Sequence, residues 1–328
     1  MKRKNSINQT LFLGPGPEQD LNPYARIIVD EALRRGIEVQ VDDAEGGLFS
    51  LSQGGRRIRC RESLSDLTSA VSMTLCQDKR LTHRALARVG IRQPTQRLAG
   101  SDAENAVFLA EHGSLVAKPV NGEQGQGVAV DLRSLDEVKT AIANAEHFDS
   151  RVLLESCHQG SDLRVVVINY EVVAAAIRRP AEVVGDGQHN LRQLIEHQSR
   201  RRQAATQGES RIPMDGETER TLRAAGYGYD DVLPAGTRLA VRRTANLHTG
   251  GVLEDVTAIL HPALAEASIL AARTLEIPVV GLDLLVPGAD QPDYVLIEAN
   301  ERVGLANHQP QPTAERFIDL LFPLSRMS

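Results

Sequence analysis

Two apolar stretches near the C-terminus each contain an acidic residue where a buried strand should contain none: Leu-Asp-Leu-Leu at 282–285 and Tyr-Val-Leu-Ile-Glu-Ala-Asn at 294–300. Glu298 and Asn300 are two positions apart, so on a strand their side chains point to the same face. If the stretches are neighbouring strands, Asp283, Glu298 and Asn300 form a cluster of hard oxygen ligands, which suits Mg²⁺. The alternative is that the two carboxylates end strands at the surface, as carboxylates commonly do.

The composition describes an ordinary soluble globular protein, with 24% charged and 41% hydrophobic residues in a chain of 328. This length is enough for two or three lobes that share cores. The net charge of −6 argues against general nucleic-acid binding, and no apolar run approaches the length of a membrane span. Three widely spaced cysteines, Cys60, Cys76 and Cys157, fit reduced thiols. We therefore expect a cytoplasmic protein with neither nucleic acid nor membrane as a partner.

The first part of the chain predicts a β-α-β unit over residues 11–42. Its first strand would be Leu11-Phe12-Leu13, and its helix would begin at Pro23 after the N-cap residue Asn22. A β-hairpin is expected at residues 48–60, around two adjacent glycines.

The middle of the chain has the densest strand signals. Residues 151–178 predict three strands, with Asn169-Tyr170 as the tight turn between the last two. Residues 180–236 are polar and predict loops with one helix near 191–202. A further helix at 262–275 precedes the two acidic stretches.

A lysine is followed closely by a glycine-rich loop. Lys118 lies near the end of an apolar strand and precedes the loop at 121–128. The loop contains Gly122, Gly125 and Gly127, which let the backbone approach a ligand closely and aim N–H groups at an anion. It is not a Walker loop, because no Gly-Lys-Ser/Thr follows. A phosphate clamp is one interpretation; a hairpin turn with an exposed lysine is the other, and the motif alone favours the latter.

The order of these signals resembles that of the ATP-grasp carboxylate–amine ligases over about residues 70–323. In chain order the signals are Asp78-Lys79, Ala117-Lys118-Pro119, the glycine-rich loop, Glu155, Gly160-Ser161-Asp162-x-Arg164, Arg178-Arg179, Asn246 before Gly250-Gly251, and finally Asp283, Glu298 and Asn300. The resemblance implies a mixed α/β (α+β) ATP-grasp fold. Its parts would be an N-terminal pre-ATP-grasp lobe at 1–77, a small lid-like lobe with the glycine-rich loop at 78–155, and a C-terminal lobe with the metal site at 156–328.

Two branches of the family share further segments with this chain. Residues 178–189 and 243–251 look like the cyanophycin synthetase branch. Residues 297–308 and 60–65 resemble more closely the ligase half of N-acetylglutaminylglutamine synthetase, a family that makes a dipeptide osmoprotectant. The acetyltransferase part of that family and the Mur-ligase-like half of cyanophycin synthetase have no counterpart in this sequence. The acetylation step and the product therefore stay open.

The resemblance implies an ATP-dependent peptide ligase that activates a carboxylate as an acyl phosphate, with ATP and two Mg²⁺ ions as cofactors. Small amino-acid or peptide substrates and a homo-oligomer are expected, as in similar ligases. The implied nucleotide-binding residues are Lys79, Lys118, Gly122, Gln124, Gly125, Gly127, Glu155, Ser156, Cys157, His158 and Asp162. The implied metal ligands are Asp283, Glu298 and Asn300, the catalytic residues Arg178 and Asn246, and the substrate-binding residues Arg302 and His308.

Two other hypotheses compete with this one. The chain could be a non-catalytic module in which ATP only orders the loop; the full set of carboxylates argues against this, because such a module could lose one metal ligand without harm. It could also be a ligase of other specificity, such as a cyanophycin-like or glutathione-like enzyme. The sequence does not choose between these specificities.

Overall fold

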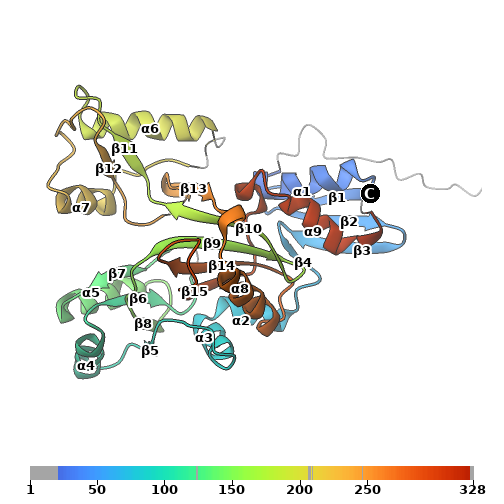
Figure 1. The fold of residues 1–328 in the computed structure, drawn as a ribbon, viewed down its shortest axis with the longest axis horizontal. Helices are drawn as coiled ribbons and strands as arrows, with labels where there is room; N and C mark the ends of the chain where they lie inside the picture. Colours follow the sequence, from blue (N-terminus) through green and yellow to red (C-terminus); the bar gives the residue numbers. More distant parts are fainter. Residues whose placement is uncertain (1–20, 123–124, 206–207, 209, 246, 326–328) are drawn as a thin grey trace, which may run out of the picture.

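The N-terminal lobe packs one helix against a small antiparallel sheet (Figure 1). The computed structural model describes residues 21–122, 125–205, 208, 210–245 and 247–325. Asn22 caps the helix by accepting a hydrogen bond from the backbone of Ala25 at 2.9 Å, as its sequence predicts. The predicted hairpin is also present, whereas the expected strand Leu11-Phe12-Leu13 lies outside the described residues. The elements of this lobe are α1 (Pro23–Arg34), β1 (Glu38–Asp43), β2 (Leu48–Gln53), β3 (Arg56–Arg61) and β4 (Leu64–Ser65).

A five-stranded antiparallel sheet forms the centre of the molecule, in the order β13-β10-β9-β14-β15. Asn169 and Tyr170 make the predicted tight turn between β9 and β10, with φ of +53° and +61°. The strands are β9 (Ser161–Ile168), β10 (Glu171–Arg179), β13 (Val252–Asp255), β14 (Val279–Val286) and β15 (Val295–Asn300).

Alternating residues of β9 serve two different cores, which fixes which helices cover each face of the central sheet. Val166 and Ile168 pack with the N-terminal lobe and with α9. Val165 and Val167 point the other way, to the core that includes Leu264 of α8. The covering helices are α2 (Ala70–Gln77), α3 (Lys79–Ala87), α8 (Pro262–Thr274) and α9 (Thr313–Leu321).

A second, smaller sheet in the order β5-β8-β6-β7 carries two helices on one face (Figure 1). Ser134 and Glu137 form the expected capping box at the start of α5, and Ser101 and Glu104 form an equivalent one at the start of α4. The elements are β5 (Gln96–Leu98), α4 (Asp102–His112), β6 (Leu115–Pro119), β7 (Ala129–Leu132), α5 (Leu135–Ala145) and β8 (Val152–Ser156).

The chain between β10 and β13 forms an additional lobe with its own apolar core (Figure 1). The polar sequence predicts loops and one helix here, but the structure has two helices and a two-stranded sheet. The strands are three residues long, too short for an alternation signal, and α7 is polar apart from its buried face. The elements are β11 (Glu182–Val184), α6 (Leu191–Ala205), α7 (Gly216–Ala224) and β12 (Arg238–Ala240).

The mixed α/β fold class is confirmed, while the division at residues 77/78 and 155/156 stays a prediction. Helix α3 follows the expected boundary at 77/78, but it packs against β15 of the central sheet and against helix α8. The small sheet begins only after α3, with β5. The remaining elements are short 3₁₀ helices at Leu247–Thr249, Thr257–Ile259, Leu305–His308 and Pro323–Ser325. None of the helices within the described residues combines the length and apolar character that crossing a bilayer requires.

The contact between α1 and α9 depends on one buried arginine. The side chain of Arg35 is 4% exposed and donates to Glu31 and to Asp319, both at 2.6 Å. Arg35→Ala removes the buried positive charge that Glu31 and Asp319 share across the two helices, so we expect the free energy of unfolding to fall by about 3 kcal/mol. Arg34 on the same helix also pairs with Glu31 but is half exposed. Arg34→Ala is therefore the matched control, and urea-denaturation midpoints equal in both variants would contradict the prediction.

Candidate active site

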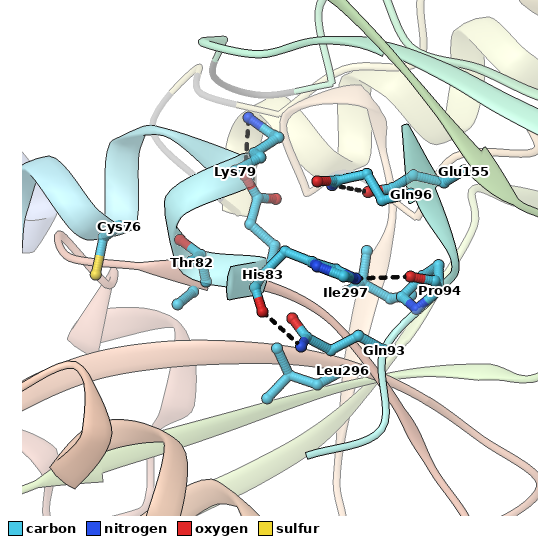
Figure 2. A pocket seen from close by; sticks show the side chains of 12 residues that line it. Cys76, Lys79, Thr82, His83, Gln93, Pro94, Gln96, Glu155, Leu296 and Ile297 are labelled. Atoms are coloured by element: carbon cyan, nitrogen blue, oxygen red, sulfur yellow. Dashed lines mark hydrogen bonds and ion pairs between the residues drawn. The ribbon is translucent and has the colours of Figure 1, made fainter. Parts of the chain in front are cut away.

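A pocket open to solvent lies where the small sheet meets α3 and the central sheet (Figure 2). Three of its charged side chains come from three different elements: Lys79 from α3, Glu155 from β8 and Glu298 from β15. His83 of α3 hydrogen-bonds through Nε2 to the carbonyl oxygen of Pro94 at 2.9 Å, which holds the helix against the segment leading to β5. The other lining residues are Cys76, Thr82, Gln93, Gln96, Leu296, Ile297 and Ala299.

Lys79 connects the glycine-rich loop to the acidic strand. Asp78 caps α3 by accepting from the backbone N–H groups of Arg80 and Leu81, and this places Lys79 at the first position of the helix. The Lys79 ammonium donates to the carbonyl oxygen of Gly122 at 2.9 Å and lies 3.3 Å from Oε1 of Glu298. One cation therefore contacts both the loop that is expected to hold phosphates and a carboxylate that is expected to hold a metal.

Lys118 and Glu155 form a buried ion pair with Nζ and Oε2 2.7 Å apart, each side chain 5% exposed. The register of β6 and β8 explains the pair, since Glu155 lies opposite Val116, two residues from Lys118 on the same face. Gln96 donates a second hydrogen bond to Glu155 at 2.7 Å (Figure 2). The alternative of an exposed lysine beside the glycine-rich loop is therefore wrong.

The segment after β8 leads from the small sheet toward β9. Ser156 accepts a hydrogen bond from the backbone of Thr95 at 3.0 Å and also bonds to Nε2 of His158. Cys157 donates its backbone N–H to the carbonyl oxygen of Ser114 at 3.0 Å. These contacts hold residues 156–158 against the residues that directly precede β5 and β6. The His158 side chain is exposed.

The two acidic stretches pair as neighbouring strands, as their sequence predicts. Asp283 of β14 lies opposite Glu298 of β15, and Gly281 lies opposite Asn300. Nδ2 of Asn300 is 3.3 Å from Oδ2 of Asp283. Asp283 lies within β14 and is 6% exposed, so the alternative that it ends a strand at the surface is wrong.

Two arginines neutralise the buried carboxylate of Asp283. Arg164 of β9, directly opposite in the register, donates to both carboxylate oxygens, and its Nη2 lies 3.1 Å from Oδ2. Arg178 of β10 reaches Oδ2 at 3.0 Å and also donates to Asp162 at 2.8 Å. The sequence order includes Arg164 but assigns it no role, because the contact depends on a strand register that the sequence does not give.

Burial and the nearby charges shift the pKa values of Asp283, Asp162 and His308. Burial opposes ionisation of Asp283, but the charges of Arg164 and Arg178 outweigh it and lower the pKa of this carboxyl. Burial raises the pKa of Asp162 against the opposing charge of Arg178. Burial, reinforced by the two guanidinium groups, lowers the pKa of His308 to about 4, so its imidazole is neutral at pH 7.

The donor set at the acidic strands fits Mg²⁺ in kind, with two carboxylates and one amide oxygen on one face. Within the described residues, no group of three or more His, Cys, Asp or Glu side chains is arranged to hold a metal ion. Asp283 is instead engaged by guanidinium groups, while Glu298 has a side chain that is 31% exposed. Glu298 is thus the more accessible of the two carboxylates.

The structure describes four of the six remaining expected site residues. Arg302 is 3.5 Å from Glu62 of the N-terminal lobe, and His308 is buried in a 3₁₀ helix. Gly125 and Gly127 have positive φ of +77° and +67°, which their residue type permits. Gln124 and Asn246 lie outside the described residues.

Comparison with known proteins relates this arrangement to a family. Residues 76–197 match the model of the RimK-like ATP-grasp domain. A cyanophycin synthetase from Trichormus variabilis is 31% identical over 324 residues, covering 93% of this chain and 36% of that protein. Residues 76–197 therefore form a RimK-like ATP-grasp domain. A bifunctional glutathione biosynthesis protein from Listeria innocua is 27% identical over 320 residues, covering 93% of this chain and 42% of that one.

The fold of this chain is also similar to that of a solved structure. The crystal structure of a bifunctional glutathione synthetase from Pasteurella multocida superposes with a TM-score of 0.68 at 20% identity, covering 93% of this chain and 44% of that one. The chain thus spans less than half the length of these relatives.

The buried ion pair generates a prediction for nucleotide binding. Lys118→Met keeps the apolar stem but removes the charge, and a charge-assisted contact to phosphate contributes about 1.5–3 kcal/mol. We therefore expect ATP affinity, measured by calorimetry, to fall roughly tenfold or more. Lys139→Met, which breaks an exposed pair with Asp102, is the control and should leave affinity unchanged. Equal affinities in the two variants would remove Lys118 from the nucleotide site.

Proposed function

We propose that this chain is an ATP-dependent carboxylate–amine ligase that forms a peptide bond through an acyl phosphate. The observation that carries the proposal is the position of Lys79, whose ammonium contacts Gly122 of the glycine-rich loop and Glu298 of the acidic strand. A triphosphate bound between these two elements would meet a cation already held at their junction. Positioning and charge neutralisation account for most of phosphoryl-transfer catalysis.

The adenine half of ATP would bind in the pocket beside the small sheet. Glu155 lines this pocket and would accept from the adenine amino group, and the backbone of residues 156–158 would border the ring. Asp162 would bind the ribose, which requires Arg178 to release part of its contact with this carboxylate. Lys118 would turn from Glu155 toward the phosphates.

Asp283, Glu298 and Asn300 would hold two Mg²⁺ ions. Bound there, the ions would neutralise charge on the phosphates. The protein's own contribution is to keep these oxygens on one face of two paired strands. Arg164 and Arg178 keep Asp283 ionised in the buried sheet, which is the protonation state that a metal ligand needs.

Arg178 and Asn246 would stabilise the negative charge that develops during transfer. Arg178 already lies on the same face as Asp283, because the two side chains are in contact. Arg302 and His308 would bind the carboxylate or amine substrate. A neutral imidazole at His308 can accept a hydrogen bond from an incoming amine at pH 7.

The substrate proposal rests on residues 297–308 and 60–65. We propose a glutamine-containing dipeptide such as N-acetylglutaminylglutamine as the product, with cyanophycin-like or glutathione-like specificity as the alternative. Cytoplasmic location is supported by three free cysteines, two of them buried. A homo-oligomer is proposed by analogy with similar ligases.

Phosphate release in the presence of ATP, Mg²⁺ and pairs of amino acids tests the activity. The panel should include glutamine with N-acetylglutamine, aspartate with arginine, and γ-glutamylcysteine with glycine. We expect release above the ATP-only background for one pair, with the amide product detected by mass spectrometry. ATP binding without release for any pair would favour the non-catalytic module.

Glu298 tests the metal proposal separately. Glu298→Gln keeps the shape but removes a charge needed most in the transition state, so kcat should fall on the order of a hundredfold or more. ATP affinity should change much less, because Lys118 and the adenine pocket remain. Asn300→Ala should act in the same direction but more mildly.

The matched control for this variant is Glu301→Gln. Glu301 is three residues from Glu298 along the same segment and accepts from Gln77 at 3.2 Å, away from the pocket lining. Its substitution should leave kcat within about twofold. A kcat of Glu298→Gln equal to that of this control would contradict the two-metal proposal.

A further inference from the structure

The turn that joins α5 to β8 carries an acidic residue with an unusual number of donors. The carboxylate of Asp149 is 10% exposed and accepts from the backbone N–H of Asn121 at 3.2 Å and from its side-chain amide at 2.8 Å. Arg151 donates to it as well, through its backbone N–H at 2.8 Å and through its guanidinium. Neither the sequence motifs nor the proposed chemistry assigns a role to this turn.

The contacts of Asp149 belong to a closed ring. Nη1 of Arg151 lies 3.6 Å from the carboxylate of Asp78, the residue that caps α3. Lys79 follows Asp78 in the chain and donates to the carbonyl oxygen of Gly122, which follows Asn121. The ring therefore runs from the glycine-rich loop through the turn to the start of α3, and back to the loop.

Burial and charge show that the ring is held firmly at Asp149. Burial opposes ionisation there, but the hydrogen bonds from Arg151 and Asn121 lower the pKa of Asp149 to about 2. The carboxylate is thus charged at any pH near neutrality, and its bonds are charge-assisted.

The same turn contacts the other end of the glycine-rich loop. A Cβ built on Gly127 would lie 2.7 Å from the ring of Phe148 and 3.2 Å from Cα of Ala145. This close approach requires glycine at position 127 and leaves the aromatic ring of Phe148 against the loop backbone. Residues 148–149 therefore contact both described ends of the loop.

We propose that Asp149 is a positioning residue for the nucleotide phosphates. It fixes Asn121-Gly122 relative to the N-terminus of α3, so that Lys79 and the backbone of these two residues meet the phosphates as one preformed unit. The inference rests on the proposed function, because it assumes that ATP phosphates bind between Lys79 and the loop. It adds a residue that touches no ligand and acts through Asn121 and Arg151.

The test compares a ligand with phosphates and a ligand without them. Asp149→Asn removes the charge and turns an acceptor into a donor that faces other donors. We expect the affinity for Mg·AMP-PNP, measured by calorimetry on the full chain, to fall about tenfold. The affinity for adenosine, measured by ligand-observed NMR, should stay within about twofold, because the adenine pocket does not include this turn.

Two further variants make the outcome decisive. Asn121→Ala removes only the side-chain bond to Asp149 and should weaken Mg·AMP-PNP about threefold. Asp102→Asn makes the same chemical change at an exposed pair with Lys139 in the same lobe, and should leave both affinities unchanged. If Asp149→Asn does not fold, as judged by thermal melting, Asn121→Ala decides the question.

Unchanged Mg·AMP-PNP affinity in Asp149→Asn would overturn the inference, and so would an equal loss for adenosine, which marks general loosening. For Asn121→Ala, affinity equal to that of the Asp102→Asn control would do the same. A wild-type chain that binds no Mg·AMP-PNP refutes the proposed function and this inference with it. A chain that binds the analogue but ligates nothing refutes the ligase activity alone.

Discussion

The central sheet depends on the neutralisation of one buried carboxylate. Asp283 lies in β14, between β9 and β15, where an unpaired charge would be far too costly to bury. Arg164 of β9 and Arg178 of β10 offset this cost by pairing with the carboxylate. If any of these strands slipped by one residue, its charged side chain would point into an apolar core. The ion cluster therefore forms only in this register, and it stabilises this register.

The same cluster explains why, of the two carboxylates on the paired strands β14 and β15, one is protected and the other accessible. Asp283 is covered by guanidinium groups, whereas Glu298 in the adjacent strand lies beside Lys79 and lines the pocket. Helix α3 is the bridge, because it packs on the central sheet while its first residue reaches the glycine-rich loop. Lys79 therefore links the glycine-rich loop of the small sheet to β15 of the central sheet.

Much of the fold follows from local sequence signals. The cap at Asn22, the capping box at Ser134 and the turn at Asn169-Tyr170 are each fixed by residues within a few positions of one another. The side-by-side position of Asp283, Glu298 and Asn300 follows from a period of two and from the pairing of adjacent strands. The order of motifs correctly indicates an ATP-grasp domain, while the individual site roles stay predictions.

What the sequence did not give depends on contacts between distant segments. Arg164 meets Asp283 across a register separated by more than a hundred residues, and Lys118 is buried because Glu155 arrives from another strand. Asp149 lacks a motif altogether, since its partners Asn121 and Arg151 converge only in the folded turn. The sequence predicts too few elements in the additional lobe, because strands of three residues are too short to show an alternation of apolar and polar residues.

That lobe has a consequence for how the family diversifies. Its core is built from its own residues, and its entry and exit strands are joined where Val241 donates to Ala181 at 2.9 Å. A unit that leaves and rejoins a scaffold at neighbouring points can be lengthened, trimmed or exchanged without disturbing the scaffold's register. The part of the lobe between these two residues, 182–240, can therefore change in evolution while the strands that carry Asp283 and Glu298 stay unchanged.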